Sequence, residues 1–499
     1  MLSGMSDASR VVNSAFLSVA AKLLGKTLGL FSTFIVARIL TPEDFGFIAI
    51  VSMALYLFDI LSHAAGEQYI VQKRSVGYFD LHTAWSFNLL LKLIIALVIM
   101  VCANGIAAFF DKPQLGLAIM ASAITLPLQA LKSYKLMLLK RQLRFKPLFW
   151  LSLAERVFAL PMLITFALVL GNYWAFVITD VLVAMFGLIF SYLLVRGRPF
   201  FTLKQVRVQW AFSQWMLGKH LLGYARSQID TFVVAKWFST SLLGNYHMAR
   251  DLAMMPAHYL LNPAIEPLLA VYKNDRDNKA ELLNNVAFSL FVVFAISIPV
   301  LAVLALYAKP LVFVLLGEKW SVAAQLLPVL AILFFYWCIV QVLDAALIAL
   351  NQIRLVFVFD VLSLAVVALA LLWALSNQLS LFELARARAV AGLISALVLL
   401  GWLFSGYWQH LKPLLMLAIV ITSITGLAMM PMWLVDTEPF PSSNSTLTHY
   451  IQSAAELAVF TVLYSGMFSL LLTYSKHYQL LRLKQLILQH LPATWVRKT

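Results

Sequence analysis

The stretch KLLGKTLGLFSTFIVARILTPEDFGFIA, residues 22–49, has a counterpart 198 residues later, HLLGYARSQIDTFVVAKWFSTSLLGNYH, residues 220–247. The gap-free alignment gives eight identities in 28 positions and pairs Gly25 with Gly223 and Gly46 with Gly244. In each copy an apolar run ends at a basic residue, Arg38 or Lys236. A shorter echo joins residues 142–144 to 352–354. The pattern indicates two similar halves in one chain.

The apolar runs around this stretch predict an all-α integral membrane protein. The chain has 499 residues, of which 62% are hydrophobic and only 12% charged, about half the charged fraction of a soluble domain. Runs near 20 residues can cross a bilayer core of about 30 Å as helices. We expect about 14 such spans, at 11–37, 45–66, 84–110, 115–138, 148–170, 173–195, 212–237, 244–266, 283–307, 322–350, 355–375, 387–408, 413–435 and 453–474.

The basic residues predict the orientation of these spans. With the N-terminus in the cytoplasm, 23 Lys and Arg residues fall on the cytoplasmic side and 7 on the other. This bias satisfies the positive-inside rule, and the even number of spans puts both termini in the cytoplasm. The net charge of +15 therefore reflects membrane topology, and nucleic acid is not an expected partner.

The repeat also predicts how the spans are grouped. We expect a six-span bundle at 1–207, a second at 208–410, and two additional spans with a cytoplasmic tail at 411–499. Six spans are an even number, so the two bundles have the same orientation. Parallel repeats related by an axis along the membrane normal are a transporter architecture.

Signals of catalysis are missing from the sequence. It contains no P-loop, dinucleotide fingerprint, zinc-ligand set or nucleophile elbow. Both cysteines, Cys102 and Cys338, lie inside apolar runs. We therefore expect no enzyme activity, catalytic residues, metal or cofactor.

Ionisable residues inside spans are the candidates for function, because charge is costly in lipid. Lys22 and Lys26 lie near the middle of the first span, on one helical face, with no acidic residue at helical spacing. They require an anionic ligand, a water-filled cavity or an acid on another helix. Both a ligand site and a structural ion pair remain open.

The repeat-related seventh span carries Lys219, Arg226 and Asp230. Arg226 and Asp230 are four residues apart and could form a structural pair, which we favour slightly. Together the two spans supply four basic residues against one acidic residue, a balance that suits an anion such as a diphosphate. Lys22, Lys26, Lys219 and Arg226 are the candidate substrate-binding residues.

The second span carries a polar stripe of Asp59, His63 and Glu67 at intervals of four residues. With Asp230, these residues are candidates for ion coupling, since histidine titrates near neutral pH. They could equally neutralise the lysines of the first span. For Glu67 we favour this structural interpretation.

Four segments resemble Wzx-type polysaccharide flippases, which belong to the multidrug/oligosaccharidyl-lipid/polysaccharide exporter superfamily. They are FIVARILTPEDFGF (34–47), LGNY (243–246), LLGEKW (315–320) and RQLRF (141–145). The resemblance covers nearly the whole chain and is strongest over 10–355. One departure is Asn351, which stands where many relatives have glycine.

The resemblance implies a flippase of the bacterial inner membrane. Such a protein moves a polyprenyl-diphosphate-linked oligosaccharide across the membrane by alternating access, for the synthesis of O-antigen, capsule or exopolysaccharide. It also implies two six-helix bundles around a central cleft, with basic residues of the cleft in contact with the diphosphate. Membrane lipids, a coupling cation (H⁺ or Na⁺) and the polysaccharide polymerase machinery are candidate partners.

Two other functions remain open. A cation-coupled multidrug antiporter of the same superfamily would need carboxylates at the centre of the cleft, and Asp59 and Glu67 keep it in consideration. A membrane glycosyltransferase or ligase would use the same lipid carrier. It usually needs a sizeable external loop, whereas the longest one expected here is 436–452.

Overall fold

In the computed structural model, every secondary-structure element of the described residues is a helix. The structure describes residues 25, 27–62, 69–70, 73, 75–142, 144–434, 446–475 and 477–490. Among them, nine helices are long and apolar enough to cross a membrane, and a bent pair makes up to ten. The chain is therefore an all-helical, multi-pass membrane protein, as predicted. The total of fourteen spans stays a prediction.

The chain divides into two compact units. Unit 1 is Met1–Met248 with Leu315–Val322, and unit 2 is Ala249–Val314 with Ala323–Thr499. Helix Thr27–Ile39 comes first in the described part of unit 1. It is followed by α2 (Pro42–Ser62), α4 (Tyr78–Phe109), α5 (Leu115–Ala123), α6 (Thr125–Ala130), α7 (Lys135–Arg141), α8 (Lys146–Leu170), α9 (Trp174–Leu194), α10 (Val206–Trp237) and the start of α11 (Thr240–Pro256).

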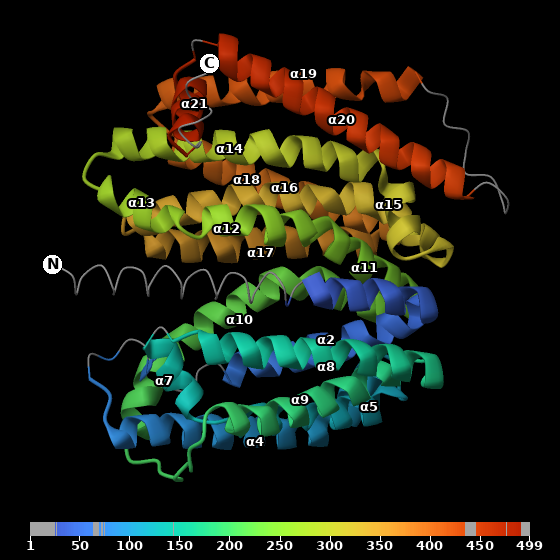
Figure 1. Ribbon diagram of the computed structural model, residues 1–499, viewed down its shortest axis with the longest axis vertical. Helices are drawn as coiled ribbons and strands as arrows, with labels where there is room; N and C mark the ends of the chain where they lie inside the picture. Colours follow the sequence, from blue (N-terminus) through green and yellow to red (C-terminus); the bar gives the residue numbers. More distant parts are fainter. Residues whose placement is uncertain are drawn as a thin grey trace. The chain divides into compact units, whose positions relative to one another are not determined.

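Unit 2 continues from the end of α11. Its elements are the π-helix Ala257–Leu261, α12 (Asn262–Ile265), α13 (Leu268–Asn274), α14 (Lys279–Leu306), α15 (Ala308–Leu315), α16 (Ser321–Ala349), α17 (Ile353–Ser376), α18 (Leu381–Leu403), α19 (Trp408–Leu434), α20 (Thr446–Tyr474) and α21 (Tyr478–His490). The short 3₁₀ turn Glu318–Trp320 precedes α16. Within each unit most of the long helices lie side by side (Figure 1).

The sequence TPED, residues 41–44, forms the cap at the start of α2. Thr41 precedes the helix, and its backbone N–H donates to Asp44 Oδ2 at 3.0 Å while the Asp44 N–H donates to Thr41 Oγ1 at 3.2 Å. This reciprocal pair satisfies N–H groups that have no partner inside the helix. Asp44 is buried, and its other oxygen accepts from the Tyr173 N–H at 3.0 Å. One carboxylate thus joins the start of α2 to the start of α9.

The segment 315–320 packs inside unit 1 through Trp320. This side chain is fully buried, and its Nε1 donates to the carbonyl of Ala37 at 3.0 Å. Its ring meets Phe45 edge-on at 5.1 Å between centroids. Lys319 Nζ donates to the carbonyls of Arg38, at 2.9 Å, and Leu40. The LLGEKW motif therefore caps the end of helix Thr27–Ile39.

The predicted fourth span, 115–138, is broken in the structure. Leu115–Ala130 and Lys135–Arg141 form a pair bent by 65°. Ser133, in the break, is held at the end of α9: its N–H donates to Ser191 Oγ at 3.1 Å, and its Oγ donates to the carbonyl of Val195 at 3.0 Å. These bonds replace the helical ones that the bend removes. Pro256 is the last residue of α11, and the π-helix Ala257–Leu261 follows it directly.

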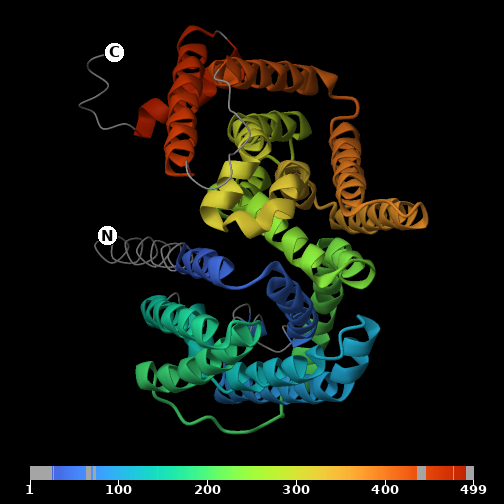
Figure 2. The same ribbon diagram turned by 90° about the vertical axis from the view of Figure 1, so that its right-hand side faces the viewer.

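Two further turns position the helices. Residues 195–205 form an extended loop between α9 and α10, the green coil below the helices in Figure 2. It is attached to α4, because the Thr202 N–H donates to Ser86 Oγ at 3.0 Å. Before α17, Asn351 has a φ of 60°. Asparagine tolerates this left-handed conformation better than most residues, so the turn does not require the glycine of relatives.

Unit 2 is built around α16, which has the most buried apolar window, with 67% of the residues buried. Helices α14 and α19 pack together, as do α17 and α18. The last span, α20, has only 6% of its window buried. It still contacts α14, because Tyr464 Oη donates to the carbonyl of Ala295 at 2.5 Å.

Candidate functional site: a charged cavity within unit 1

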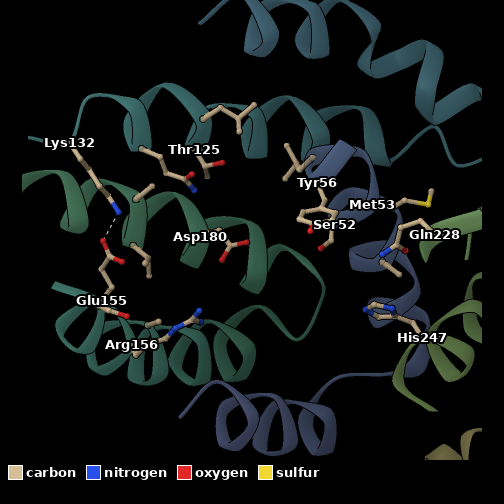
Figure 3. Close-up of a pocket in the computed structure, with 18 of the residues that line it drawn as sticks. Ser52, Met53, Tyr56, Thr125, Lys132, Glu155, Arg156, Asp180, Gln228 and His247 are labelled. Atoms are coloured by element: carbon tan, nitrogen blue, oxygen red, sulfur yellow. Dashed lines mark hydrogen bonds and ion pairs between the residues drawn. The ribbon is translucent and has the colours of Figure 1, made fainter. Parts of the chain in front are cut away.

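A cavity of about 580 Å³ lies inside unit 1. Its walls come from α2, α6, α8, α9, α10 and α11, all of them parts of predicted spans. The polar residues that line it are Ser52, Tyr56, Thr125, Gln129, Lys132, Ser152, Glu155, Arg156, Asp180, Gln228, Thr231 and His247. Concave sites with a few polar groups on rigid helices are where transporters and binding proteins hold their ligands. Figure 3 shows these side chains around an open space.

One end of the cavity is formed by an ion pair. Lys132 Nζ lies 2.6 Å from Glu155 Oε1, and each side chain keeps 22% of its surface exposed. Lys132 reaches this position because it lies in the break after α6, and its carbonyl accepts a bond from Trp85 Nε1 at 3.0 Å. The α9 helix makes room with Gly187, where a Cβ would lie 2.1 Å from Glu155 Oε1. Only glycine fits here without displacing the pair.

Arg156 provides a second cation, and it is differently placed. Its side chain is exposed to the cavity, with no hydrogen bond or ion pair to any described residue. It packs beside the first helix, 3.8 Å from the positions that a Cβ of Gly25 or Gly29 would take. A guanidinium without a hydrogen-bonding partner, inside a membrane-embedded cavity, is suited to bind a phosphate through two parallel N–H···O bonds.

Asp180 of α9 also lines the cavity and is exposed to it. It interacts electrostatically with Arg156, but no described residue forms a hydrogen bond or a close ion pair with it. In Figure 3 Arg156 and Asp180 extend into the same space from two helices. The cavity therefore holds one closed ion pair and one open pair of opposite charges. An open pair can exchange partners when a ligand enters.

The wall toward α10 is held by contacts from α2. Tyr224 Oη donates to the carbonyl of Met53 at 2.7 Å, and the Tyr224 and Tyr56 rings lie 5.7 Å apart. Tyr56 exposes 52% of its surface, into the cavity that it lines. These bonds set the spacing between α2 and α10, which determines how wide the cavity is on this side.

The structure describes the side chains of only some of the residues that the sequence predicted for substrate binding and ion coupling. Lys22, Lys26, His63 and Glu67 lie outside the described residues, as do the side chains of Asp59 and Lys219. The other two are Arg226 and Asp230, and neither lines the cavity. Asp230 is completely buried and accepts bonds from Tyr246 Oη at 2.9 Å and the Thr231 N–H at 2.8 Å. These contacts favour a structural role for Asp230.

The sequence interpretation gave no role in binding to Lys132, Arg156 or Asp180. The signal was present for Asp180, an acidic residue in the middle of the predicted span 173–195. It was also present for Arg156, a basic residue inside the predicted span 148–170. Adjacent residues on a helix point in different directions, and here they meet different partners.

The comparisons with known proteins agree with this architecture. The family model described as "Polysaccharide biosynthesis protein" matches residues 35–325. The chain is 22% identical over 366 residues to the lipopolysaccharide biosynthesis protein WzxC of Escherichia coli, a match that covers 72% of this chain and 73% of that protein. It is 25% identical over 304 residues to the succinoglycan biosynthesis transport protein ExoT of Rhizobium meliloti, covering 60% and 61%.

Solved structures show the same fold. The lipid II flippase MurJ, in an inward closed conformation, superposes with a TM-score of 0.69 at 15% identity, covering 92% of this chain and 99% of that one. An inward-facing multidrug resistance transporter of the MATE family gives a TM-score of 0.56 at 13% identity, covering 78% and 96%. With the family model matching more than half of its length, this chain belongs to the family of polysaccharide biosynthesis proteins to which that model gives its name.

Proposed function

We propose that this protein is a flippase that moves a polyprenyl-diphosphate-linked oligosaccharide across the bacterial inner membrane by alternating access. Three facts support the proposal: the family membership, the flippase-like fold and the cavity in unit 1. The observation that carries it is Arg156, a cation exposed in a membrane-embedded cavity without a hydrogen bond to any described residue. Charge in such a place is costly unless a ligand, water or counter-ion compensates it.

The proposed substrate fits the cavity in two ways. Its diphosphate would bind Arg156, because guanidinium and phosphate form bidentate hydrogen bonds. Hydroxyl groups of a sugar would bind the uncharged polar side chains nearby, such as Gln129, Thr125 and Gln228. The proposal also includes Lys22 and Lys26, which flank Gly25 in the sequence, and Lys219 and Arg226 of α10.

The proposed topology has about fourteen spans, arranged as two six-span bundles around a central cleft, at 1–207 and 208–410, and two further spans at 411–499. Both termini would be cytoplasmic, as the distribution of Lys and Arg favours. Reporter fusions at Thr202 and Ser443 should report cytoplasm and exterior respectively. The same side for both positions would disprove this topology.

The second candidate is a multidrug antiporter, favoured by the MATE-like fold and by the two carboxylates of the cavity. Glu155, however, is neutralised by Lys132 at 2.6 Å, so a cationic drug would find only Asp180, with Arg156 beside it. A nearby guanidinium disfavours an organic cation and favours an anion. The flippase proposal therefore explains the charges better.

The test is the position of the lipid-linked oligosaccharide in cells that lack the protein. Loss of a flippase should leave it on the cytoplasmic leaflet, whereas loss of a ligase would leave it on the outer leaflet. Restoring the wild-type chain should restore export, and Arg156→Ala should insert in the membrane but not export. Arg386→Ala is the matched control, because this exposed arginine lies over Phe382 in α18. Export by Arg156→Ala at the wild-type rate would contradict the role of Arg156.

A further inference from the structure

A second cavity, of about 130 Å³, lies in unit 2 at the ends of three helices. Its walls come from the first turns of α14 and α19 and from the turn between α20 and α21. The polar side chains that line it are Asn284, Gln409, His410, His477, Tyr478 and Gln479. All three helices are candidate membrane spans, so their ends mark a boundary between lipid and water.

The cavity has a buried acceptor without a partner. Gln479 is only 7% exposed, and its Nε2 donates to Asn284 Oδ1 at 2.9 Å. Its Oε1 is buried and receives no hydrogen bond from the described residues. A buried amide oxygen left in this state costs free energy, so a donor from outside the chain would stabilise the site.

The same cavity also holds hydrogen-bond donors. His477 Nδ1 accepts a bond from the Gln479 N–H at 3.3 Å, which assigns the ring proton to Nε2. Burial lowers the pKa of His477 below its ordinary value, so the ring is neutral at pH 7 and keeps this single N–H. An N–H donor and an orphan acceptor in one cavity suit a ligand that has both phosphate oxygens and hydroxyl groups.

Helix α21 places basic and apolar side chains next to this cavity. It lies across the direction of α14 (Figure 1), and Arg482 lies over the ring of Phe288 of α14 at 4.5 Å. Leu480 is buried against the protein, whereas Leu481 and Leu488 expose 42% and 36% of their surfaces on another part of the helix. Helices of this kind lie in the membrane interface, with apolar residues among acyl chains and basic residues near headgroups.

The charge near the cavity is positive. Among the described residues 477–490, Arg482 and Lys484 are basic and none is acidic. None of the acidic residues near the start of α14 lines the cavity: Asp275 accepts from Asn285 at 2.6 Å, Asp277 pairs with Arg276 at 3.5 Å, and Glu281 accepts from Asn278 Nδ2 at 3.4 Å. Basic residues beside a span attract anionic lipids of the adjacent leaflet.

We propose that this cavity binds the headgroup of an anionic phospholipid with hydroxyl groups, such as phosphatidylglycerol, and that α21 lies in the plane of the same leaflet. The phosphate interacts with Arg482 and Lys484, a headgroup hydroxyl donates to Gln479 Oε1, and the acyl chains lie along Leu481 and Leu488. In the proposed topology this is the cytoplasmic leaflet. The inference does not depend on what the cavity of unit 1 transports.

Hydrogen exchange of the full-length protein in lipid nanodiscs tests the proposal. In nanodiscs that contain phosphatidylglycerol, the amides of 477–490 should exchange more slowly than in pure phosphatidylcholine. Arg482→Gln with Lys484→Gln should weaken the effect of phosphatidylglycerol by up to about 30-fold in apparent affinity, since each surface cation contributes about a factor of five. The matched control is Arg198→Gln with Lys204→Gln, which removes two cations from unit 1. This variant should leave the effect of phosphatidylglycerol on 477–490 unchanged.

Three further experiments test separately whether the cavity, an intact lipid and the transport site are needed for this protection. His410→Phe fills the cavity and should abolish the preference for phosphatidylglycerol while α21 remains helical. If it keeps the preference, surface charge alone is responsible and the headgroup site is disproved. Glycerol phosphate added to phosphatidylcholine nanodiscs should not protect 477–490, and equal protection would show a site for soluble anions instead. Equal exchange in both lipids would overturn the whole proposal. Arg156→Ala should keep the lipid preference even if it abolishes export.

Discussion

Gly46 and Gly244 pack against each other's helix so closely that neither position has room for a Cβ. A Cβ on Gly46 would lie 1.9 Å from the carbonyl oxygen of Thr240, and a Cβ on Gly244 would lie 1.7 Å from that of Pro42. The repeat relates these two contacts to each other, because at its offset of 198 residues Pro42 corresponds to Thr240 and Gly46 to Gly244. The starts of α2 and α11 therefore meet through two equivalent contacts, as expected at a symmetry axis between the repeats.

We predict that Gly46→Ala and Gly244→Ala each destabilise the protein, because the clash is with backbone that cannot rotate away. Overpacking of this kind costs about 1–3 kcal/mol. The melting temperature of the purified protein should fall for both variants and should not fall for Gly223→Ala, because no atom lies within 4 Å of that Cβ position. A wild-type melting temperature for Gly46→Ala would show that the two helices separate easily.

The end of α10 offers a prediction about a surface contact. Lys236 Nζ donates to the Phe109 carbonyl at 2.6 Å and to Asp111 Oδ2 at 2.7 Å. The Asp111 carboxylate is largely exposed, so its ion pair contributes little. We expect Asp111→Asn to have a small effect on thermal stability and Lys236→Met a larger one, because it also leaves the carbonyl without its donor. An equal effect of both variants would contradict this interpretation.

The same pair predicts a pH dependence. The hydrogen bond from Lys236, and then its charge, lower the pKa of Asp111 below its ordinary value of 3.8. A carboxylate with a lowered pKa stabilises the folded state above its unfolded pKa, and this contribution is lost only as the pH falls through the lowered value. The difference in melting temperature between wild type and Asp111→Asn should therefore stay constant from about pH 5 to 8 and shrink only below about pH 4.

Contacts between residues close together in the chain could be predicted from the sequence, whereas contacts between distant residues could not. Thr41 and Asp44 act locally, through a helix cap, whereas the contact of Gly46 is with Thr240, far along the chain, and only the repeat drew attention to it. Trp320 is different, because nothing in its own segment shows that it donates to Ala37, 283 residues away. The motif resemblance marked its position but could not supply its partner.

The cavity was harder to predict for a physical reason. Lys132 reaches Glu155 only because the predicted span 115–138 is broken after α6. Arg156 and Asp180 meet across two helices, and the helical spacing rules used on the sequence compare residues only within one helix. The same rules did identify Lys22 and Lys26, and the present structure describes Gly25 and Gly29 of that helix next to Arg156.

A double-mutant cycle should show that Lys132 and Glu155 act as a pair. Removal of one partner leaves an uncompensated charge in a membrane-embedded cavity, which typically costs about 3–5 kcal/mol for a buried pair and less here, since each side chain is 22% exposed. Lys132→Met and Glu155→Gln should each lower the melting temperature, and the double variant should recover most of the loss. If the two losses simply add, the pair does not stabilise the cavity. Gly187→Ala should resemble Glu155→Gln, because its Cβ would displace the carboxylate.

The last prediction concerns Asp180 and rests on charge balance. The ionisable lysine, arginine and acidic side chains of the cavity are Lys132, Glu155, Arg156 and Asp180, and their formal charges cancel. A diphosphate adds negative charge to this space. Asp180 would then oppose it unless the carboxylate takes up a proton or a metal cation, because like charges repel strongly away from bulk water. Binding of substrate and binding of a cation at Asp180 are therefore expected to favour each other, with equal strength in both directions.

Asp180→Asn separates binding from coupling. The neutral amide no longer repels the diphosphate, so we expect substrate affinity at pH 8 to rise and its dependence on pH or Na⁺ to disappear. Affinity should be measured by retention of the lipid-linked oligosaccharide on purified protein over pH 5.5 to 8.5, with and without Na⁺. Asp277→Asn, in the exposed loop before α14, is the control and should follow wild type. Should Asp180→Asn keep the wild-type dependence, the cation is taken up elsewhere, and Asp59 and His63 of the second predicted span are the next residues to replace.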